Sequence, residues 1–196
     1  MEVNGRKIGI DQRPYVIAEL SANHGGSIER AKKSIYSAAL SGVDAIKIQT
    51  YTPDTMTIDS DKNDFQILSG LWKGHTLYQL YGKAFTPFEW HKEIFEYASE
   101  LGVTLFSTPF DESALELLEG LKTPAYKIAS FELTDIPLIE NIARKNKPIF
   151  LSTGMGSLEE ISDAVEIIKK YNNSGLLLFH CISSYPAPVE QSNLSN

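Results

Sequence analysis

One strand–helix–strand unit is visible in PIFLSTGMGSLEEISDAVEIIKKYNNSGLLLFHC, residues 148–181. Two short apolar runs, Pro148–Ser152 and Leu176–Cys181, have the length and composition of buried strands. Between them, Ser157-Leu-Glu-Glu160 has the spacing of a capping box and predicts the start of a helix. A strand, a helix and a second strand in this order are typical of a parallel sheet.

The same rhythm extends back to Tyr15. Four more apolar runs predict strands, at Tyr15–Leu20, Ala45–Tyr51, Thr104–Ser107 and Ala125–Ala129. Helix start signals separate them: Ser27, Asp111, Thr134 or Asp135, and Thr86-Pro-Phe-Glu89, which resembles a capping box with proline in the first helical position. Gly42 is suited to end the helix that follows Ser27.

Six strand–helix units favour an α/β fold, and two architectures fit it. A (β/α)8 barrel has eight units in about 250 residues, so this chain of 196 residues would contain only the first six. An open doubly wound sheet would be complete at this length. It commonly carries a Gly-rich G-x-G-x-x-G turn after the first strand, and this sequence has none there.

Composition excludes several classes of protein. There are 18 Lys and Arg against 25 Asp and Glu, a net charge of −7, which argues against non-specific nucleic-acid binding. The single cysteine, Cys181, cannot form an internal disulfide, and no Cys/His cluster has zinc spacing. We find no signal peptide and no apolar stretch long enough for a membrane span, so we expect a cytoplasmic protein.

One long connection interrupts the rhythm, between Tyr51 and Thr86. A long loop on a regular scaffold often serves recognition or forms a lid. Its aromatic residues, Trp72, Tyr78 and Tyr81, are suited to an apolar pocket. Two other readings remain open: an extra helix around Leu77–Tyr81 that only covers the barrel edge, and aromatic side chains that only pack the loop onto the barrel.

Polar residues close nearly every predicted strand, where parallel α/β proteins bind their ligands. Lysines inside apolar strands are costly unless an anion or a carboxylate compensates them, which makes Lys47 and Lys127 informative. Together with the hydroxyls of Thr108, Ser130 and Ser152 they can form a phosphate or carboxylate cradle. The alternative is that each lysine pairs with a protein carboxylate such as Glu19 or Glu132.

The remaining candidates are less specific. Glu19 and Glu132 supply the pair of carboxylates that acid–base chemistry needs. His24 and His180 could be bases or metal ligands, but a lone histidine is more often structural. Cys181 at the end of an apolar strand is expected to be a small buried hydrophobe.

The motifs together resemble the sialic acid synthase family. The resemblance is carried by Ala18–Gly26 (AELSANHGG), Lys47–Thr50 (KIQT), Ser107–Asp111 (STPFD), Tyr126–Thr134 (YKIASFELT), Leu151–Met155 (LSTGM) and His180–Pro188 (HCISSYPAP). Within the family, Leu71–Tyr81 and Ala84–Trp90 look most like the pseudaminic acid branch.

The resemblance implies a (β/α)8 TIM-type barrel that joins phosphoenolpyruvate to an open-chain amino sugar. In the pseudaminic branch the sugar is 2,4-diacetamido-2,4,6-trideoxy-L-altrose, and the products are a nine-carbon 2-keto acid and phosphate. The N-acetylneuraminate and legionaminic acid branches are the alternatives. A different class of function is a truncated barrel that binds anions without turnover.

The resemblance also implies roles for particular residues. Phosphoenolpyruvate would contact Lys47, Thr108, Lys127, Ser130 and Ser152; the sugar would contact Gln49 and Tyr185; and Glu19 and Glu132 would transfer protons and direct water to C2. The family uses a divalent metal, Mn²⁺ or Mg²⁺, whose histidine ligands we expect beyond residue 196. We likewise expect the last strands and a C-terminal antifreeze-like domain to be absent, the full-length protein to be a homodimer, and the 196-residue chain alone to be inactive or weakly active.

Overall fold

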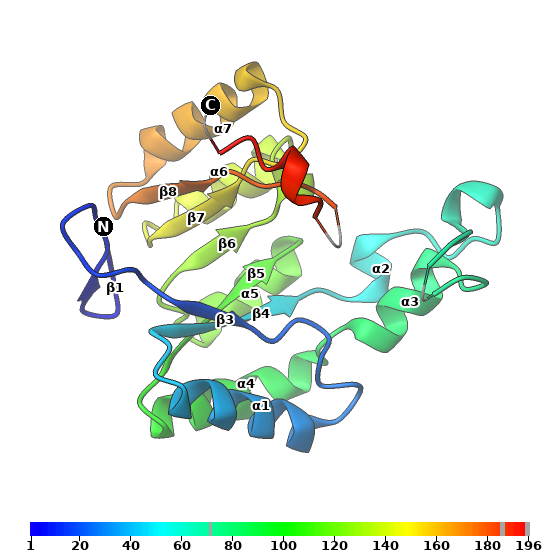
Figure 1. Ribbon diagram of the computed structural model, residues 1–196, viewed down its shortest axis with the longest axis horizontal. Helices are drawn as coiled ribbons and strands as arrows, with labels where there is room; N and C mark the ends of the chain where they lie inside the picture. Colours follow the sequence, from blue (N-terminus) through cyan, green and yellow to red (C-terminus); the bar gives the residue numbers. More distant parts are fainter. Residues whose placement is uncertain (71, 185–186, 195–196) are drawn as a thin grey trace. The chain divides into compact units, whose positions relative to one another are not determined.

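The computed structural model describes residues 1–70, 72–184 and 187–194 (Figure 1). These residues form two compact units. Unit I comprises Arg13–Thr123, and unit II comprises Met1–Gln12 with Pro124–Asn196.

Unit I contains three parallel strands, β3 (Ile17–Glu19), β4 (Ala45–Thr50) and β5 (Thr104–Pro109). The register places Glu19 beside Lys47, and Gln49 beside Thr108. Because parallel strands end at the same edge of a sheet, the polar residues that close these strands share one edge.

The described residues of unit I form five α-helices. They are α1 (Ile28–Leu40), α2 (Pro53–Met56), α3 (Leu77–Ala84), α4 (Phe88–Glu100) and α5 (Glu112–Gly120). Buried side chains of α1 and α4, including Ile35 and Ile94, pack with Ile46 and Ile48 of β4 in one apolar cluster. Ser27 and Asp111 cap α1 and α5 as predicted.

The long connection of unit I is partly helical. It contains α2, a short 3₁₀ turn (Asn63–Phe65) and α3, which begins with a Thr76–Gln79 capping box. Tyr81 of α3 makes an edge contact with Tyr51, which follows β4, and Tyr51 makes another with Phe110. The extra helix is therefore present, and it packs against the ends of the strands.

Unit II contains three further parallel strands, β6 (Tyr126–Ile128), β7 (Ile149–Ser152) and β8 (Leu176–Phe179). Its helices are α6 (Ile136–Ala143) and α7 (Leu158–Tyr171), with 3₁₀ turns at Ser130–Glu132 and Val189–Gln191. Asp135 caps α6, and the predicted Ser157–Glu160 capping box is confirmed in α7. All six predicted strands are thus present.

An N-terminal hairpin that was not predicted from the sequence is formed by β1 (Glu2–Val3) and β2 (Arg6–Lys7). Asn4 and Gly5 connect the strands with φ values of 48° and 80°. Positive φ at both central residues is the requirement of a type I′ turn, for which Asn-Gly is the strongest sequence signal. The signal was present in the sequence as Val3-Asn-Gly-Arg6.

The predicted capping box at Thr86 is wrong. Helix α4 begins at Phe88, and Pro87 occupies the N-cap position without a side-chain cap. The Thr86 hydroxyl instead lies 3.4 Å from Nε2 of His24, a contact between residues 62 positions apart. A tertiary partner has replaced the local one.

Among the helices that the structure describes, none is long and apolar enough to cross a bilayer.

Candidate active site

In unit I, predicted site residues gather where β3 and β4 end. Lys47 Nζ forms an ion pair with Glu19 Oε2. The Lys47 side chain is 17% exposed and that of Glu19 is 40% exposed, so the pair is open to solvent on its carboxylate side. The structure therefore shows Lys47 paired with a protein carboxylate, which was the alternative to an anion partner.

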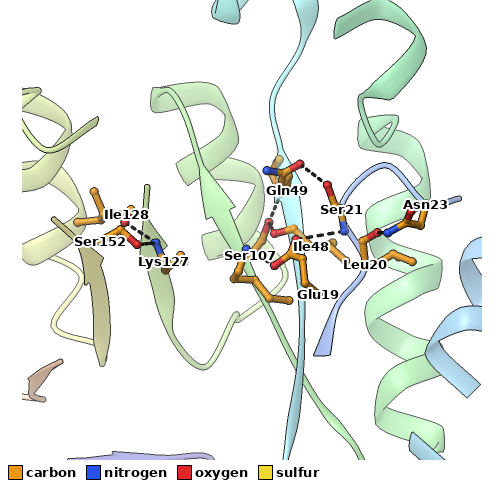
Figure 2. Close-up of polar contacts among 12 residues, drawn as sticks. Glu19, Leu20, Ser21, Asn23, Ile48, Gln49, Ser107, Lys127, Ile128 and Ser152 are labelled. Carbon is orange, nitrogen blue, oxygen red and sulfur yellow. Dashed lines mark hydrogen bonds and ion pairs between the residues drawn. The ribbon is translucent and has the colours of Figure 1, made fainter. Parts of the chain in front are cut away.

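Ser21 ties this pair to the next strand position. Its backbone N–H donates to Glu19 Oε1 at 3.1 Å, and its hydroxyl donates to Gln49 Oε1 at 3.4 Å (Figure 2). Ser21 adopts φ = 48°, which turns the chain sharply after β3. No role is predicted for Ser21 from the sequence, and this contact makes it an orienting neighbour of Gln49. Thr108 lies beside Gln49 in the β4–β5 register and is almost fully buried.

In unit II, Lys127 is the central cation. It is 9% exposed, and its Nζ donates to Ser152 Oγ at 2.6 Å and to the Ile128 carbonyl at 2.7 Å (Figure 2). Both of these acceptors are neutral oxygens. These two acceptors do not neutralise the ammonium, whose charge also lowers the pKa of Glu132, so the lysine is suited to contact an anion.

The Ser152 hydroxyl connects Lys127 to Cys181. Its oxygen accepts from Lys127 and from the Cys181 thiol, the latter at 3.2 Å. Since both contacts use lone pairs of Ser152 Oγ, the hydroxyl hydrogen remains to donate to a further group. Cys181 is half-buried, so the expectation of a buried hydrophobe is wrong: its thiol lies among polar neighbours.

Gly154 lets the backbone approach this cluster closely. Its N–H donates to Ser130 Oγ at 3.1 Å. A Cβ at this position would lie 2.4 Å from Ser183 Oγ and 2.9 Å from Ser130 Oγ, so a side chain would displace both hydroxyls. Glycine is therefore required here by contact with site residues.

Glu132 has an unusual environment for a carboxylate. Its Oε2 is buried and has no hydrogen-bond partner among the described residues. Burial raises the pKa of Glu132 to about 7, against the opposing effects of its own backbone and the Lys127 charge. A carboxyl group that titrates near neutral pH can both give and take a proton under physiological conditions.

The two candidate histidines have partners within the protein. His24 is fully buried beside Thr86 and makes an edge contact with Trp90, which supports the structural reading. His180 donates from Nε2 to the Ser192 carbonyl at 3.0 Å. Tyr185, predicted to contact the sugar, lies outside the described residues.

Three aromatic residues of the long connection have different environments. Tyr81 packs on Tyr51, as in the packing alternative. Tyr78 donates its hydroxyl to Asp54 at 2.9 Å, whereas Trp72 is 40% exposed and contacts the ring of His75. Of these three aromatic side chains, Trp72 is the most exposed to solvent.

Within residues 1–70, 72–184 and 187–194, no group of three or more His, Cys, Asp or Glu side chains is placed to hold a metal ion. The described part of the chain therefore offers no ligand set for the metal that the resemblance implies.

Comparisons with known proteins identify relatives of the chain. A profile of the NeuB family matches residues 34–196. The pseudaminic acid synthase of Helicobacter pylori (strain ATCC 700392 / 26695) is 48% identical over 183 residues, 93% of this chain and 54% of that protein. The N,N'-diacetyllegionaminic acid synthase of Legionella pneumophila subsp. pneumophila is 34% identical, over 98% of this chain and 56% of that protein.

A solved structure supports the fold. The N-acetylneuraminic acid synthetase of Leptospira borgpetersenii serovar Hardjo-bovis, in complex with citrate, matches with a TM-score of 0.86 and 30% identity, over 100% of this chain and 63% of that one. The predicted α/β fold of the TIM-barrel type is thereby confirmed. The chain spans about half the length of the curated relatives, 54% of the Helicobacter protein. It belongs to the NeuB family.

Proposed function

We propose that this chain is part of an enzyme that joins phosphoenolpyruvate to an open-chain amino sugar, 2,4-diacetamido-2,4,6-trideoxy-L-altrose. The products would be pseudaminic acid, a nine-carbon 2-keto acid, and inorganic phosphate. The relative at 48% identity is named for pseudaminic acid synthesis, whereas the legionaminic acid relative is 34% identical. The observation that carries the anion-binding half of the proposal is Lys127, buried and held by neutral oxygens.

In the proposed reaction, a C–C bond forms before the phosphate leaves. C3 of phosphoenolpyruvate attacks the aldehyde carbon, a C–C bond forms, and the aldehyde oxygen takes up a proton. The positive charge that develops at C2 is quenched by water, which loses a proton. Cleavage of the bond between C2 and the phosphate oxygen then releases phosphate, which takes up the proton of the new C2 hydroxyl, and leaves the 2-keto group.

Lysines and hydroxyls suit the anionic substrate. An ammonium group binds a phosphate or carboxylate as a point charge, and hydroxyls and backbone N–H groups add neutral donors. We assign this role to Lys47, Thr108, Lys127, Ser130 and Ser152. The remaining hydroxyl hydrogen of Ser152 gives that residue a donor for a substrate oxygen.

The two carboxylates differ in a way that separates their roles. Glu132, with a pKa raised to about 7 by burial, is suited to transfer the proton of the attacking water or of the sugar alkoxide. Glu19 is ion-paired with Lys47 and stabilises positive charge, first that of the lysine and then that developing at C2. Gln49, oriented by Ser21, and Tyr185 are assigned to the sugar.

The family resemblance implies a divalent metal, Mn²⁺ or Mg²⁺, which would polarise the sugar aldehyde. The described residues do not form a ligand set for it. A homodimeric full-length protein remains part of the proposal.

The experiment is phosphate release from phosphoenolpyruvate with added Mn²⁺, measured on this chain and on a chain extended to the length of its relatives. Three sugars are offered in parallel: the altrose derivative, the corresponding legionaminic acid precursor, and N-acetylmannosamine. Release from the extended chain with the altrose derivative supports the proposal. Release with another sugar assigns the enzyme to that branch of the family. If phosphoenolpyruvate binds but no sugar gives phosphate release, the alternative of a barrel that binds anions without turnover is favoured.

A further inference from the structure

A buried row of polar groups lies behind the strand ends of unit I. Thr50 Oγ1 is 2.8 Å from His91 Nε2 and 2.6 Å from Ser107 Oγ. Ser107 Oγ is also 3.1 Å from the Ile48 carbonyl, and His91 Nδ1 is 3.0 Å from the Pro87 carbonyl. Thr50, Ser107 and His91 are all fully buried.

Counting protons gives these contacts a direction. The Pro87 carbonyl can only accept, so Nδ1 of His91 carries a hydrogen. A neutral imidazole has one N–H, which leaves Nε2 as an acceptor for the Thr50 hydroxyl. Thr50 Oγ1 can then accept from Ser107 at 2.6 Å, while the Ile48 carbonyl is the alternative acceptor for Ser107. Burial lowers the pKa of His91, which agrees with a neutral ring.

The row adjoins two residues of the candidate site. Thr50 follows Gln49 in β4, and Ser107 precedes Thr108 in β5, where Gln49 and Thr108 are register partners. Consecutive strand residues face opposite sides of a sheet, so Thr50 and Ser107 face α4 while Gln49 and Thr108 face away from it. The hydroxyl–hydroxyl contact thus links β4 to β5 directly behind the pair that is proposed to meet the two substrates.

The row is also anchored to α4. His91 lies in the first turn of this helix, and its Nδ1–H bond closes onto the Pro87 carbonyl at the N-cap. An apolar helix–sheet contact is not directional and tolerates small slips, whereas directional hydrogen bonds between buried groups favour one register. The orientation of Gln49 and Thr108 therefore depends on a side chain on the opposite face of the sheet.

We infer that His91 is a positioning residue: held in its Nδ1–H tautomer, it fixes the ends of β4 and β5 through Thr50 and Ser107, so that Gln49 and Thr108 keep the orientation that the substrates require. This inference rests on the proposed function. It assigns His91 no contact with a substrate.

The first test measures the tautomer without any substrate. Selective ¹⁵N labelling of histidine, with assignment by a His91→Asn variant, distinguishes a protonated Nδ1 from a protonated Nε2. We expect His91 as the Nδ1–H form in the chain extended to the length of its relatives. A protonated Nε2 in the neutral ring would overturn the inference, because Nδ1 could then not donate to Pro87.

The second test separates positioning from stability. Thr50→Val removes the hydroxyl at nearly constant shape, and we expect kcat/KM to fall about tenfold or more, as small misplacements of reacting groups do. Thr50→Ser, which keeps the hydroxyl, should restore activity to within about threefold of the wild type. Ser107→Ala is a smaller change in the same row and should also lower kcat/KM. It serves as the test if Thr50→Val does not fold.

Thr86→Val is the matched control. Thr86 is another buried threonine of unit I beside a histidine, but its partner is His24 and it does not adjoin Gln49 or Thr108. We expect kcat/KM close to the wild-type value. Equal kcat/KM for wild type, Thr50→Val and Ser107→Ala would overturn the inference. An extended wild-type chain without turnover would instead overturn the proposed function, and the inference with it.

Discussion

Two lysines occupy comparable positions in the two units, inside a short strand whose carboxyl end carries polar residues. Lys47 of β4 forms an ion pair with a carboxylate, that of Glu19. Lys127 of β6 donates to the Ser152 hydroxyl and the Ile128 carbonyl, which are neutral. Strand register makes this difference, because Glu19 lies opposite Lys47 whereas Phe150 lies opposite Lys127.

The comparison shows that a lysine in a strand can serve an anion in two ways. The Lys47–Glu19 pair is nearly neutral as a unit, so an anion that binds Lys47 competes with a carboxylate or shares the cation with it. The Ser152 hydroxyl and the Ile128 carbonyl that accept from Lys127 are dipoles that an anion need not displace. We therefore expect Lys127 to contribute more to binding phosphoenolpyruvate than Lys47 does.

The largest expected effect is that of Lys127→Met. Loss of charged hydrogen bonds should weaken phosphoenolpyruvate binding about a hundredfold, since such bonds contribute roughly 1.5–3 kcal/mol each. Isothermal titration calorimetry measures the change, and Lys169→Met, at an exposed position on α7, is the control. A larger loss for Lys47→Met than for Lys127→Met would reverse the comparison.

Glu132→Gln tests the carboxylate of unit II. With its pKa raised from 4.5 to about 7, the folded state binds the Glu132 proton more tightly than the unfolded state does. The free energy of unfolding therefore falls as pH rises from about 4.5 to about 7.

The variant removes this fall. The free energy of unfolding of Glu132→Gln should equal that of the wild type near pH 4 and exceed it by about 2 kcal/mol near pH 8. Each pKa unit corresponds to about 1.36 kcal/mol, and the total is reduced because the Glu132 side chain is partly exposed to solvent. Urea unfolding at both pH values measures it. A difference that does not vary with pH would show that Glu132 titrates normally.

The ion pair of unit I should give a smaller effect. Lys47→Met leaves Glu19 without its cation and should destabilise unit I by about 1 kcal/mol, because the carboxylate is partly exposed and screened. Adding Glu19→Gln should recover part of that loss. Strict additivity of the two changes in a double-mutant cycle would mean that the pair contributes no interaction energy.

The smallest expected effect is that of Cys181→Ser. The thiol donates to Ser152 Oγ, and a hydroxyl at the same place can donate as well. Phosphoenolpyruvate affinity should change by less than about threefold, since a neutral hydrogen bond is replaced by a similar one. Cys181→Val, which removes the donor, is the companion variant. A tenfold loss with serine would show that sulfur itself is required.

Local patterns were sufficient for most of the fold. Six apolar runs became six strands, and Ser27, Asp111 and Ser157 cap helices where they were predicted to. The exceptions have physical causes. The Asn4-Gly5 turn was a local signal that was overlooked, whereas Thr86 fails as a cap because its hydroxyl lies beside His24 from a distant part of unit I.

The candidate site was predictable only as a set of residues. The sequence by itself determined that Lys47 and Lys127 lie inside strands and that Glu19 and Glu132 lie at or after a strand's carboxyl end, because the period of a strand is a property of neighbouring residues. Their partners, the raised pKa of Glu132 and the row from His91 to Ser107 were decided by tertiary structure. The physical reason is that a charge or a hydroxyl takes its environment from strand register and helix packing, which join residues far apart in the chain.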